Sequence, residues 1–247
     1  MIKYILLGII QGITEFFPVS SSGHLVIIQK ILGITGQEVA LSVILHLGTA
    51  LALVIFFFKD ILEMLRNIKI LILVIIVSMV TGIIGLLGKD LFESMFTSPK
   101  IIALALMVTG IVLIYTKRFM NYKRDMLDIK DALVLGFTQG IAIIPGISRS
   151  GITISTLLFR KIDKKTSFRF SFLASIPAIF GATILEARKV SAAINTEFLN
   201  LFVGFIFSLL TGIFSLWILK LVLDRAKLYY FGYYCIFVAI VTLIFIK

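Results

Sequence analysis

The stretch PVSSSGH at residues 18–24 interrupts a long apolar run, and the stretch PGISRSG at residues 145–151 interrupts a second one. Within a membrane, polar and glycine-broken backbone is tolerated only where it is buried in protein or lines a wet cavity. Each stretch is therefore predicted to be a loop at membrane depth between two half-helices. Membrane proteins place ligand and ion sites at such breaks, so these loops are the first candidates for a functional site.

The composition indicates an integral membrane protein. Of the 247 residues, 60% are hydrophobic and 15% are charged, whereas soluble domains carry about 25% charged residues. No linker divides the chain, so a single membrane domain over residues 1–247 is expected. The net charge of +11 is spread over short loops between apolar runs, which favours membrane orientation, and no nucleic-acid partner is expected. The single cysteine, Cys235, excludes a disulfide framework and a thiolate metal site.

The apolar pattern predicts an all-α integral membrane protein. Two long stretches, Ile2–Leu32 and Leu133–Phe159, contain the polar loops and are predicted to be re-entrant helical hairpins. Six other stretches are long enough to be transmembrane helices: Val39–Phe58, Ile68–Leu87, Ile101–Thr116, Phe168–Ala187, Phe198–Leu219 and Leu228–Ile246.

An internal repeat relates the two loops. An offset of 128 residues aligns Ser20 with Ser148, together with neighbouring glycines, a glutamine and a second serine. The repeats cover about residues 1–116 and 130–247. Each repeat also has a Gly-x-x-x-Gly pair, which predicts close helix packing: Gly8 with Gly12, and Gly136 with Gly140.

The distribution of Lys and Arg predicts the orientation. These residues are concentrated in the segments 59–69, 117–130, 160–169 and 220–227, which the positive-inside rule places in the cytoplasm. With six spans, both termini are then outside, the first hairpin enters from outside and the second enters from the cytoplasm. The repeats therefore have inverted topology, a plan that places a site near the membrane midplane.

The residues of the loops suit an anion. Proline ends each ingoing half-helix, and serines are good N-caps for each outgoing one, so two helix N-termini are predicted to face one spot. Arg149 lies inside an apolar segment and offers a fork of donors that matches phosphate oxygens. Alternatively, the serines only cap the turns and the side chain of Arg149 extends to the membrane interface. The hydroxyl-bearing candidates are Ser20, Ser21, Ser22, Ser148, Ser150 and Thr153.

Two residues of the first half-helix are further candidates. Gln11 and Glu15 are four positions apart, so they share one helix face that can turn toward the cavity. Glu15 is expected to pair with Arg149, His24 or a metal, as a general base or as an oxygen ligand of Mg²⁺ or Ca²⁺. The alternative is a purely structural ion pair. His24 is a candidate base, acid or nucleophile, or only a cap of its half-helix. For His46, in the first full span, the alternatives are lining the cavity and packing, and packing is the expected role.

Together, these motifs resemble those of the undecaprenyl-pyrophosphate phosphatases, the bacitracin-resistance membrane phosphatases of bacteria. The resemblance rests on Gln11-x-x-x-Glu15 followed by PVSSSGH, on PGISRSGIT at residues 145–153, and on the His-Leu-Gly-Thr segment at residues 46–49. It covers essentially the whole chain. The family fold it implies has six spans and two re-entrant segments in inverted repeats. The implied activity is hydrolysis of the C55 isoprenyl pyrophosphate to the monophosphate lipid carrier, assisted by a divalent cation, Mg²⁺ or Ca²⁺.

The resemblance also implies roles for individual residues. Glu15 would be the essential carboxylate, and Ser21 or His24 the nucleophile, with Ser21 favoured because Glu15 or His24 could activate it. The family carries Glu or Gln at the position of Gln11, and Gln leaves Glu15 and substrate oxygens to bind the metal. The residues implied to hold the pyrophosphate are Arg149, Ser148, Ser150 and Thr153.

The partner expected from these features is an isoprenyl pyrophosphate lipid in the bacterial cell membrane, and a homodimer is compatible with the sequence. The resemblance implies a site that opens to the extracytoplasmic side, where the pyrophosphate carrier is released. A transporter or flippase of lipid-linked phosphate is the alternative function, because inverted repeats with broken helices are also a transporter plan. Phosphate release in detergent without a gradient separates the two functions.

Overall fold

The computed structural model describes residues 1–33, 38–186 and 191–245. The regular elements in these ranges are helices, and no strand is found there. In chain order they are α1 (Ile2–Phe16), α2 (Ser21–Ile31), α3 (Glu38–Phe56), α4 (Phe58–Arg66), α5 (Ile68–Leu87), α6 (Lys89–Met95), α7 (Pro99–Tyr115), the 3₁₀ turn η1 (Thr116–Phe119), α8 (Ile129–Ile141), α9 (Arg149–Phe159), α10 (Lys164–Glu186), α11 (Ser191–Asp224) and α12 (Tyr229–Phe245).

The predicted all-α membrane fold is confirmed. Among the described residues, α5, α7 with η1, α10 and α11 are each long and apolar enough to cross a membrane. The bent pair of α3 and α4 passes as a fifth span, and α12 is a shorter apolar helix. These elements occupy the six predicted stretches, so the protein is a multi-pass membrane protein. Two predicted span ends, Ala187 and Ile246, lie outside the described residues.

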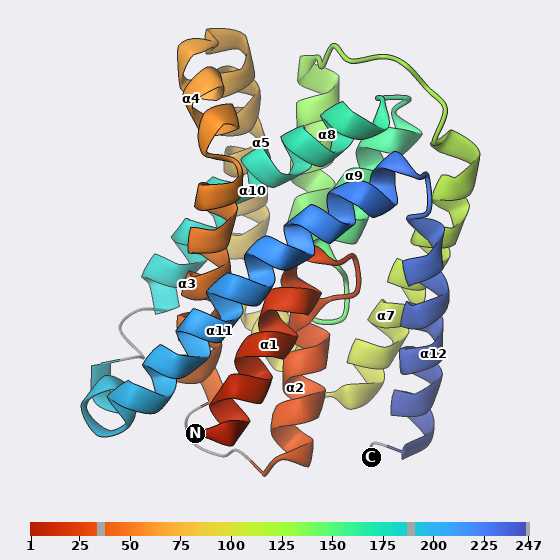
Figure 1. The fold of residues 1–247 in the computed structure, drawn as a ribbon. Coiled ribbons are helices and arrows are strands. Elements are labelled where there is room, and N and C mark those ends of the chain that lie inside the picture. The colour runs from red at the N-terminus through yellow and green to blue at the C-terminus, as the bar shows by residue number, and fades with distance from the viewer. Residues whose placement is uncertain (34–37, 187–190, 246–247) are drawn as a thin grey trace.

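Two helices differ from the sequence prediction. The first span ends at Phe56, and after a bend of 68° the chain continues as α4. Because α4 carries Lys59, Asp60 and Glu63 among apolar residues, it is amphipathic and suits an interface rather than the bilayer core. α11 is longer than predicted at both ends, because it begins at Ser191 rather than Phe198 and ends at Asp224 rather than Leu219. At about 1.5 Å per residue such a helix exceeds the bilayer core unless it tilts, and Figure 1 shows α11 running diagonally across the bundle.

Both predicted re-entrant hairpins form. α1 and α2 make the first hairpin and α8 and α9 the second, and each hairpin has its loop at the residues quoted above. The bounds of α9 are those of α2 displaced by 128 positions, as the repeat predicts. The open ends of the two hairpins lie at opposite ends of the bundle (Figure 1), which confirms the inverted topology.

Each hairpin packs on a long helix of the other repeat, and the predicted glycine pairs make this possible. α1 packs on α11, whereas α8 packs on α5, the repeat counterpart of α11. A β-carbon at Gly8 would overlap the carbonyl oxygen of Gly204 on α11, and one at Gly136 would lie 3.0 Å from the carbonyl oxygen of Val77 on α5. Bare glycine faces therefore allow close contact between backbones on both sides of the repeat.

The basic segments gather at one end of the molecule. The N-terminus and the last described turn of α12 lie at one end, while α4, the chain entering α8 and the α11–α12 turn lie at the other (Figure 1).

At this second end, Asp131 is fully buried and accepts hydrogen bonds from Arg124 Nη2 (2.9 Å) and Arg160 Nε (2.7 Å). Burial raises the pKa of Asp131, but the two arginines outweigh it and hold the pKa below its usual range. This cluster ties together the open end of the second hairpin.

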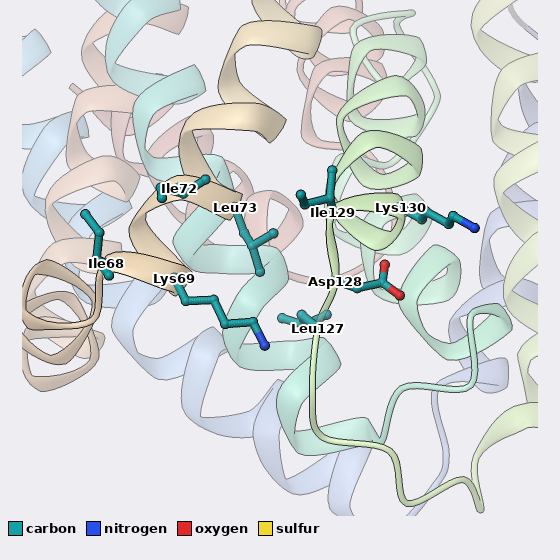
Figure 2. A pocket seen from close by; sticks show the side chains of 8 residues that line it. All are labelled: Ile68, Lys69, Ile72, Leu73, Leu127, Asp128, Ile129 and Lys130. Carbon is teal, nitrogen blue, oxygen red and sulfur yellow. The ribbon is translucent and has the colours of Figure 1, made fainter.

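A surface cavity of about 640 Å³ lies at the same end, between the start of α5 and the chain entering α8 (Figure 2). Apolar side chains form most of its wall, and Lys69 and Lys130 stand at its edge. Apolar surface flanked by lysines is typical of the boundary between lipid and water. Its lining residues are Ile68, Lys69, Ile72, Leu73, Leu127, Asp128, Ile129 and Lys130, none of which is a predicted site residue.

Candidate active site

The two polar loops meet in the middle of the bundle. Ser150 Oγ in the second loop donates a hydrogen bond to the carbonyl oxygen of Phe17 in the first loop (3.3 Å). A β-carbon on Gly23 would lie only 3.4 Å from the Cα of Gly146. Small residues therefore let the two loops approach across the repeat boundary, and their predicted meeting is observed.

Glu15 is the centre of the polar cluster. Its side chain lies in the last turn of α1 and is 8% exposed. One carboxylate oxygen, Oε1, forms an ion pair with Arg149. The other, Oε2, accepts hydrogen bonds from Ser21 Oγ (2.5 Å) and Gln11 Nε2 (3.1 Å), and it lies 3.5 Å from His46 Nε2. Of the three partners considered for Glu15 in the sequence, the structure therefore shows Arg149.

This pairing has an electrostatic reason. An isolated carboxylate in so buried a place would be strongly unfavourable, and a guanidinium that donates directly to it removes most of that cost. Arg149 is the first residue of α9, and Ser21 is the first residue of α2. The two outgoing half-helices thus begin at the same carboxylate, and their N-terminal N–H groups and positive dipole ends point toward one region.

The serine caps make the same pattern of side-chain hydrogen bonds in both repeats, although φ is 69° at Ser20 and −78° at Ser148. Ser20 Oγ accepts from Gly23 N (3.4 Å) and lies 3.3 Å from Ser22 Oγ. Ser148 Oγ accepts from Gly151 N (3.1 Å) and likewise lies 3.3 Å from the second serine of its loop, Ser150. The capping alternative therefore describes Ser20 and Ser148 in this state of the site.

Thr153 lies one turn further along α9. Its hydroxyl donates to the carbonyl oxygen of Arg149 (2.7 Å) and lies 2.6 Å from Ser171 Oγ on α10. Thr153 thus braces the first turn of α9 and, with it, the backbone of Arg149, rather than contacting Glu15.

The ring nitrogens of His24 are bonded away from Glu15. Nδ1 lies 2.8 Å from the carbonyl oxygen of Ser20, and Nε2 lies 2.8 Å from the hydroxyl of Tyr234 on α12. In this arrangement the neighbouring Ser21 has Glu15 as its acceptor, and His24 is not its partner.

Sequence reasoning missed one site residue, Tyr234, and favoured the wrong one of two roles for His46. His46 was expected to pack, but it reaches Glu15 from α3, and Thr49 on the same helix face accepts from Gln11 Nε2 (3.5 Å). The available signal was an ionisable residue inside an apolar span, which is functional by default. Tyr234 had no such signal, because it lies in an aromatic stretch typical of a membrane helix.

The site has side-chain oxygens that could serve as ligands of a cation shared with a substrate. Gln11 Oε1 is buried and has no hydrogen-bond partner, whereas Nε2 of the same amide donates to Glu15 Oε2. Mg²⁺ is commonly held by one or two protein oxygens together with substrate phosphates and water, so Gln11 and Glu15 fit this role. The described residues contain no group of three or more His, Cys, Asp or Glu that could hold a metal without substrate oxygens. Gln139, the repeat counterpart of Gln11, also has a bare Oε1, but Ile143 replaces the carboxylate there.

Comparison with known proteins places this chain in a family. The family model described as Bacitracin resistance protein BacA matches residues 4–241. The chain is 41% identical to an undecaprenyl-diphosphatase of Halothermothrix orenii, over 98% of this chain and 96% of that protein. It is 40% identical to one of Alkaliphilus metalliredigens, over 98% of each chain, and 39% identical to one of Thermotoga sp. strain RQ2, over 96% of this chain and 98% of that protein. The resemblance drawn from the two loop motifs is thereby confirmed, and the chain belongs to the bacitracin resistance protein BacA family.

Proposed function

We propose that this protein hydrolyses undecaprenyl pyrophosphate to undecaprenyl phosphate and inorganic phosphate in the bacterial plasma membrane. The names of its relatives support this activity. The observation that carries the proposal is the hydroxyl of Ser21, held 2.5 Å from one oxygen of Glu15 while Arg149 pairs with the other. A hydroxyl and a fixed cation on the two oxygens of one carboxylate form an arrangement that suits phosphoryl transfer to a side chain. The product is the lipid carrier for peptidoglycan and wall polymers, and the family name connects the activity to bacitracin resistance.

In the proposed mechanism, Glu15 accepts the hydroxyl proton of Ser21, and Ser21 Oγ attacks the terminal phosphorus of the pyrophosphate. The bond from that phosphorus to the bridging oxygen breaks, Glu15 gives its proton to that oxygen, and undecaprenyl phosphate leaves. Water then attacks the phosphoserine, Glu15 accepts a proton from the water and passes it to Ser21 Oγ, and inorganic phosphate is released as Ser21 is restored. His46 keeps the reacting carboxylate oriented from the side of α3.

The charge that develops on the transferred phosphoryl group is stabilised from the second repeat. The N–H groups of Arg149 that Glu15 does not use are free to bind phosphate oxygens in a fork. The N-termini of α2 and α9 add backbone donors at the same region. Because the cluster is largely buried, these interactions are stronger than they would be in water.

We further propose that Gln11 Oε1 and Glu15 hold a divalent cation, Mg²⁺ or Ca²⁺, together with oxygens of the pyrophosphate. Such a cation supplies positive charge that neutralises the pyrophosphate when it is bound. The bare oxygen of Gln11 supports this assignment.

The proposal places the termini outside the cell and the site open to that side. The gathering of basic segments at the end opposite the N-terminus supports this orientation (Figure 1). The lysine-edged cavity at the basic end also suits a membrane boundary.

The test is phosphate release from an isoprenyl pyrophosphate by purified protein in detergent, without a gradient, with Mg²⁺, with Ca²⁺ and with a chelator. Glu15→Gln keeps the size of the side chain and removes the base, and Glu63→Gln on α4 is the matched control. We expect release by the wild type and by Glu63→Gln, and none by Glu15→Gln. Folded wild-type protein that releases no phosphate under any cation would overturn the proposal and favour the transporter function.

A further inference from the structure

His24 has a hydrogen-bond partner at each ring nitrogen. It lies in the first turn of α2 and is 7% exposed. Nδ1 lies 2.8 Å from the carbonyl oxygen of Ser20, and Nε2 lies 2.8 Å from the hydroxyl oxygen of Tyr234. The rings of His24 and Tyr234 also stack, with centroids 5.7 Å apart and planes inclined by 8°. The tyrosine therefore holds both the position and the plane of the imidazole.

These partners select one tautomer. A carbonyl oxygen only accepts hydrogen bonds, so Nδ1 of His24 must carry a proton. A neutral imidazole then has a bare lone pair on Nε2, and the hydroxyl of Tyr234 donates to it. As long as this bond is present, Nε2 is not available as a base or as a nucleophile.

The same bonds reach the backbone beside Ser21. Ser20 has a φ of 69°, a strained conformation for a residue with a side chain. The hydrogen bond from His24 Nδ1 holds the carbonyl group of this residue. Because Ser20 immediately precedes Ser21, the orientation of the Ser20 peptide sets where the Ser21 side chain begins.

α12 contacts the first loop at two further points. The ring of Phe231 lies 5.0 Å from that of Phe17, and the thiol of Cys235 lies 3.5 Å from the carbonyl oxygen of Pro18. α12 itself is fixed by close packing on α7, where a β-carbon at Gly232 would lie only 2.6 Å from the carbonyl oxygen of Gly110. The helix that carries Tyr234 is thus a rigid support for this loop.

We infer that Tyr234 is a positioning residue of the active site: its hydroxyl and ring hold His24 in the Nδ1–H tautomer, and His24 in turn holds the Ser20 carbonyl and thereby the placement of Ser21. Tyr234 acts through His24 and does not touch the reacting atoms. Its effect on turnover rests on the proposed function, whereas its effect on the histidine does not.

The first test is spectroscopic and needs no substrate. The chain has two histidines, so ¹⁵N spectra of the purified protein contain signals from two imidazole rings. The His46→Asn variant removes one set and thereby assigns both. For neutral His24 we expect a protonated Nδ1 and a hydrogen-bonded, unprotonated Nε2. Tyr234→Phe, which keeps the ring, should shift the Nε2 signal to that of an unbonded acceptor, whereas Tyr233→Phe on the same helix should leave it unchanged. A wild-type proton on Nε2, or no shift in Tyr234→Phe, would overturn the inference.

The second test is kinetic. We expect Tyr234→Phe to lower kcat by about tenfold to a hundredfold, as small displacements of reacting groups do, with KM within about twofold of wild type because the phosphate-binding groups are untouched. Tyr233→Phe should match the wild type. Equal kcat for the two variants would overturn the positioning role and leave the proposed function standing. A wild-type protein without phosphatase activity would instead overturn the proposed function and leave the spectroscopic result to stand alone.

Discussion

Glu15, in the last turn of α1, and Arg149, the first residue of α9, form an ion pair although they lie 134 positions apart in the chain. The pair joins the two inverted hairpins at the point where their loops meet. Two of the residues that sequence analysis proposed for the chemistry, one from each repeat, are therefore direct neighbours.

Arg149→Lys tests whether the guanidinium fork matters beyond its charge. Lysine keeps a cation beside Glu15, so the protein should fold, but it loses the planar pair of donors that binds phosphate oxygens. We expect kcat to fall by about 100-fold or more, the scale for removing a donor that stabilises transition-state charge. Exposed Arg225→Lys is the control. Near-normal turnover would reduce Arg149 to a counter-charge for Glu15.

The nucleophile is identified by trapping the phosphoenzyme. Rapid quenching with substrate labelled on the terminal phosphate should place the label on Ser21, and Ser21→Ala should remove both the label and turnover. Ser22→Ala, in the same loop, should retain activity within about tenfold, as for a residue that contributes only a hydrogen bond. Label found on His24 would transfer the nucleophile role to that residue and contradict the mechanism above.

Gln11 is expected to tune the cation requirement. Gln11→Glu adds a second carboxylate next to Glu15 and should lower the Mg²⁺ concentration for half-maximal activity, by about tenfold if the new ligand contributes about 1.4 kcal/mol. Gln11→Met has similar volume but no oxygen and should raise this concentration. Titration of phosphate release with Mg²⁺ after chelator treatment measures both changes. Identical curves for the three proteins would remove Gln11 from the cation site.

Two glycines give a matched test of the helix contacts. A β-carbon at Gly12 would lie 2.7 Å from the backbone oxygen of Ser208 on α11, whereas a β-carbon at Gly82 on α5 meets nothing within 4 Å. Gly12→Ala should destabilise the protein by about 1–3 kcal/mol through overpacking. Gly82→Ala should be neutral or slightly stabilising, because alanine is the better helix former. Thermal unfolding in one detergent compares them, and equal Tm values would contradict the close packing of α1 on α11.

Asp131 predicts a loss of stability in acid. Its pKa is held below the ordinary value of a carboxyl group by Arg124 and Arg160. The ionised form therefore stabilises the fold above the unfolded-state pKa of about 4, and this contribution disappears as the pH falls through the lower folded-state pKa. The Tm of wild type should exceed that of Asp131→Asn at pH 7, and the difference should shrink below about pH 4. Exposed Asp125→Asn is the control; a gap that is constant with pH would rule out this role.

The hairpins and their caps could be predicted from the sequence because local chemistry determines them. Proline ends a helix, serine begins one, and polar backbone inside an apolar run must be enclosed, so the positions of both loops follow from short stretches. The 128-residue repeat then implied that the loops face each other. The glycine pairs predicted close contacts but not which helices they join.

The contacts of single side chains could not be predicted in the same way. His46 reaches Glu15 and Tyr234 reaches His24 only because α3 and α12 take particular places around the loops. Such places depend on the packing of whole helices rather than on neighbouring residues. The bend between α3 and α4 was not predicted either; it lies where charged residues directly follow an apolar run.

The exchange of helices between the repeats has a consequence for how the chain is made. α1 of the first repeat packs on α11 of the second, which is synthesised later, and α8 packs on α5 of the first repeat. Each of these two helix contacts therefore needs one helix from each repeat, and neither repeat can form either contact alone. Until α11 has been synthesised and inserted, the glycine face of α1 therefore lacks its packing partner. The two loops of the candidate site can therefore reach their final packing only after α11 is in place.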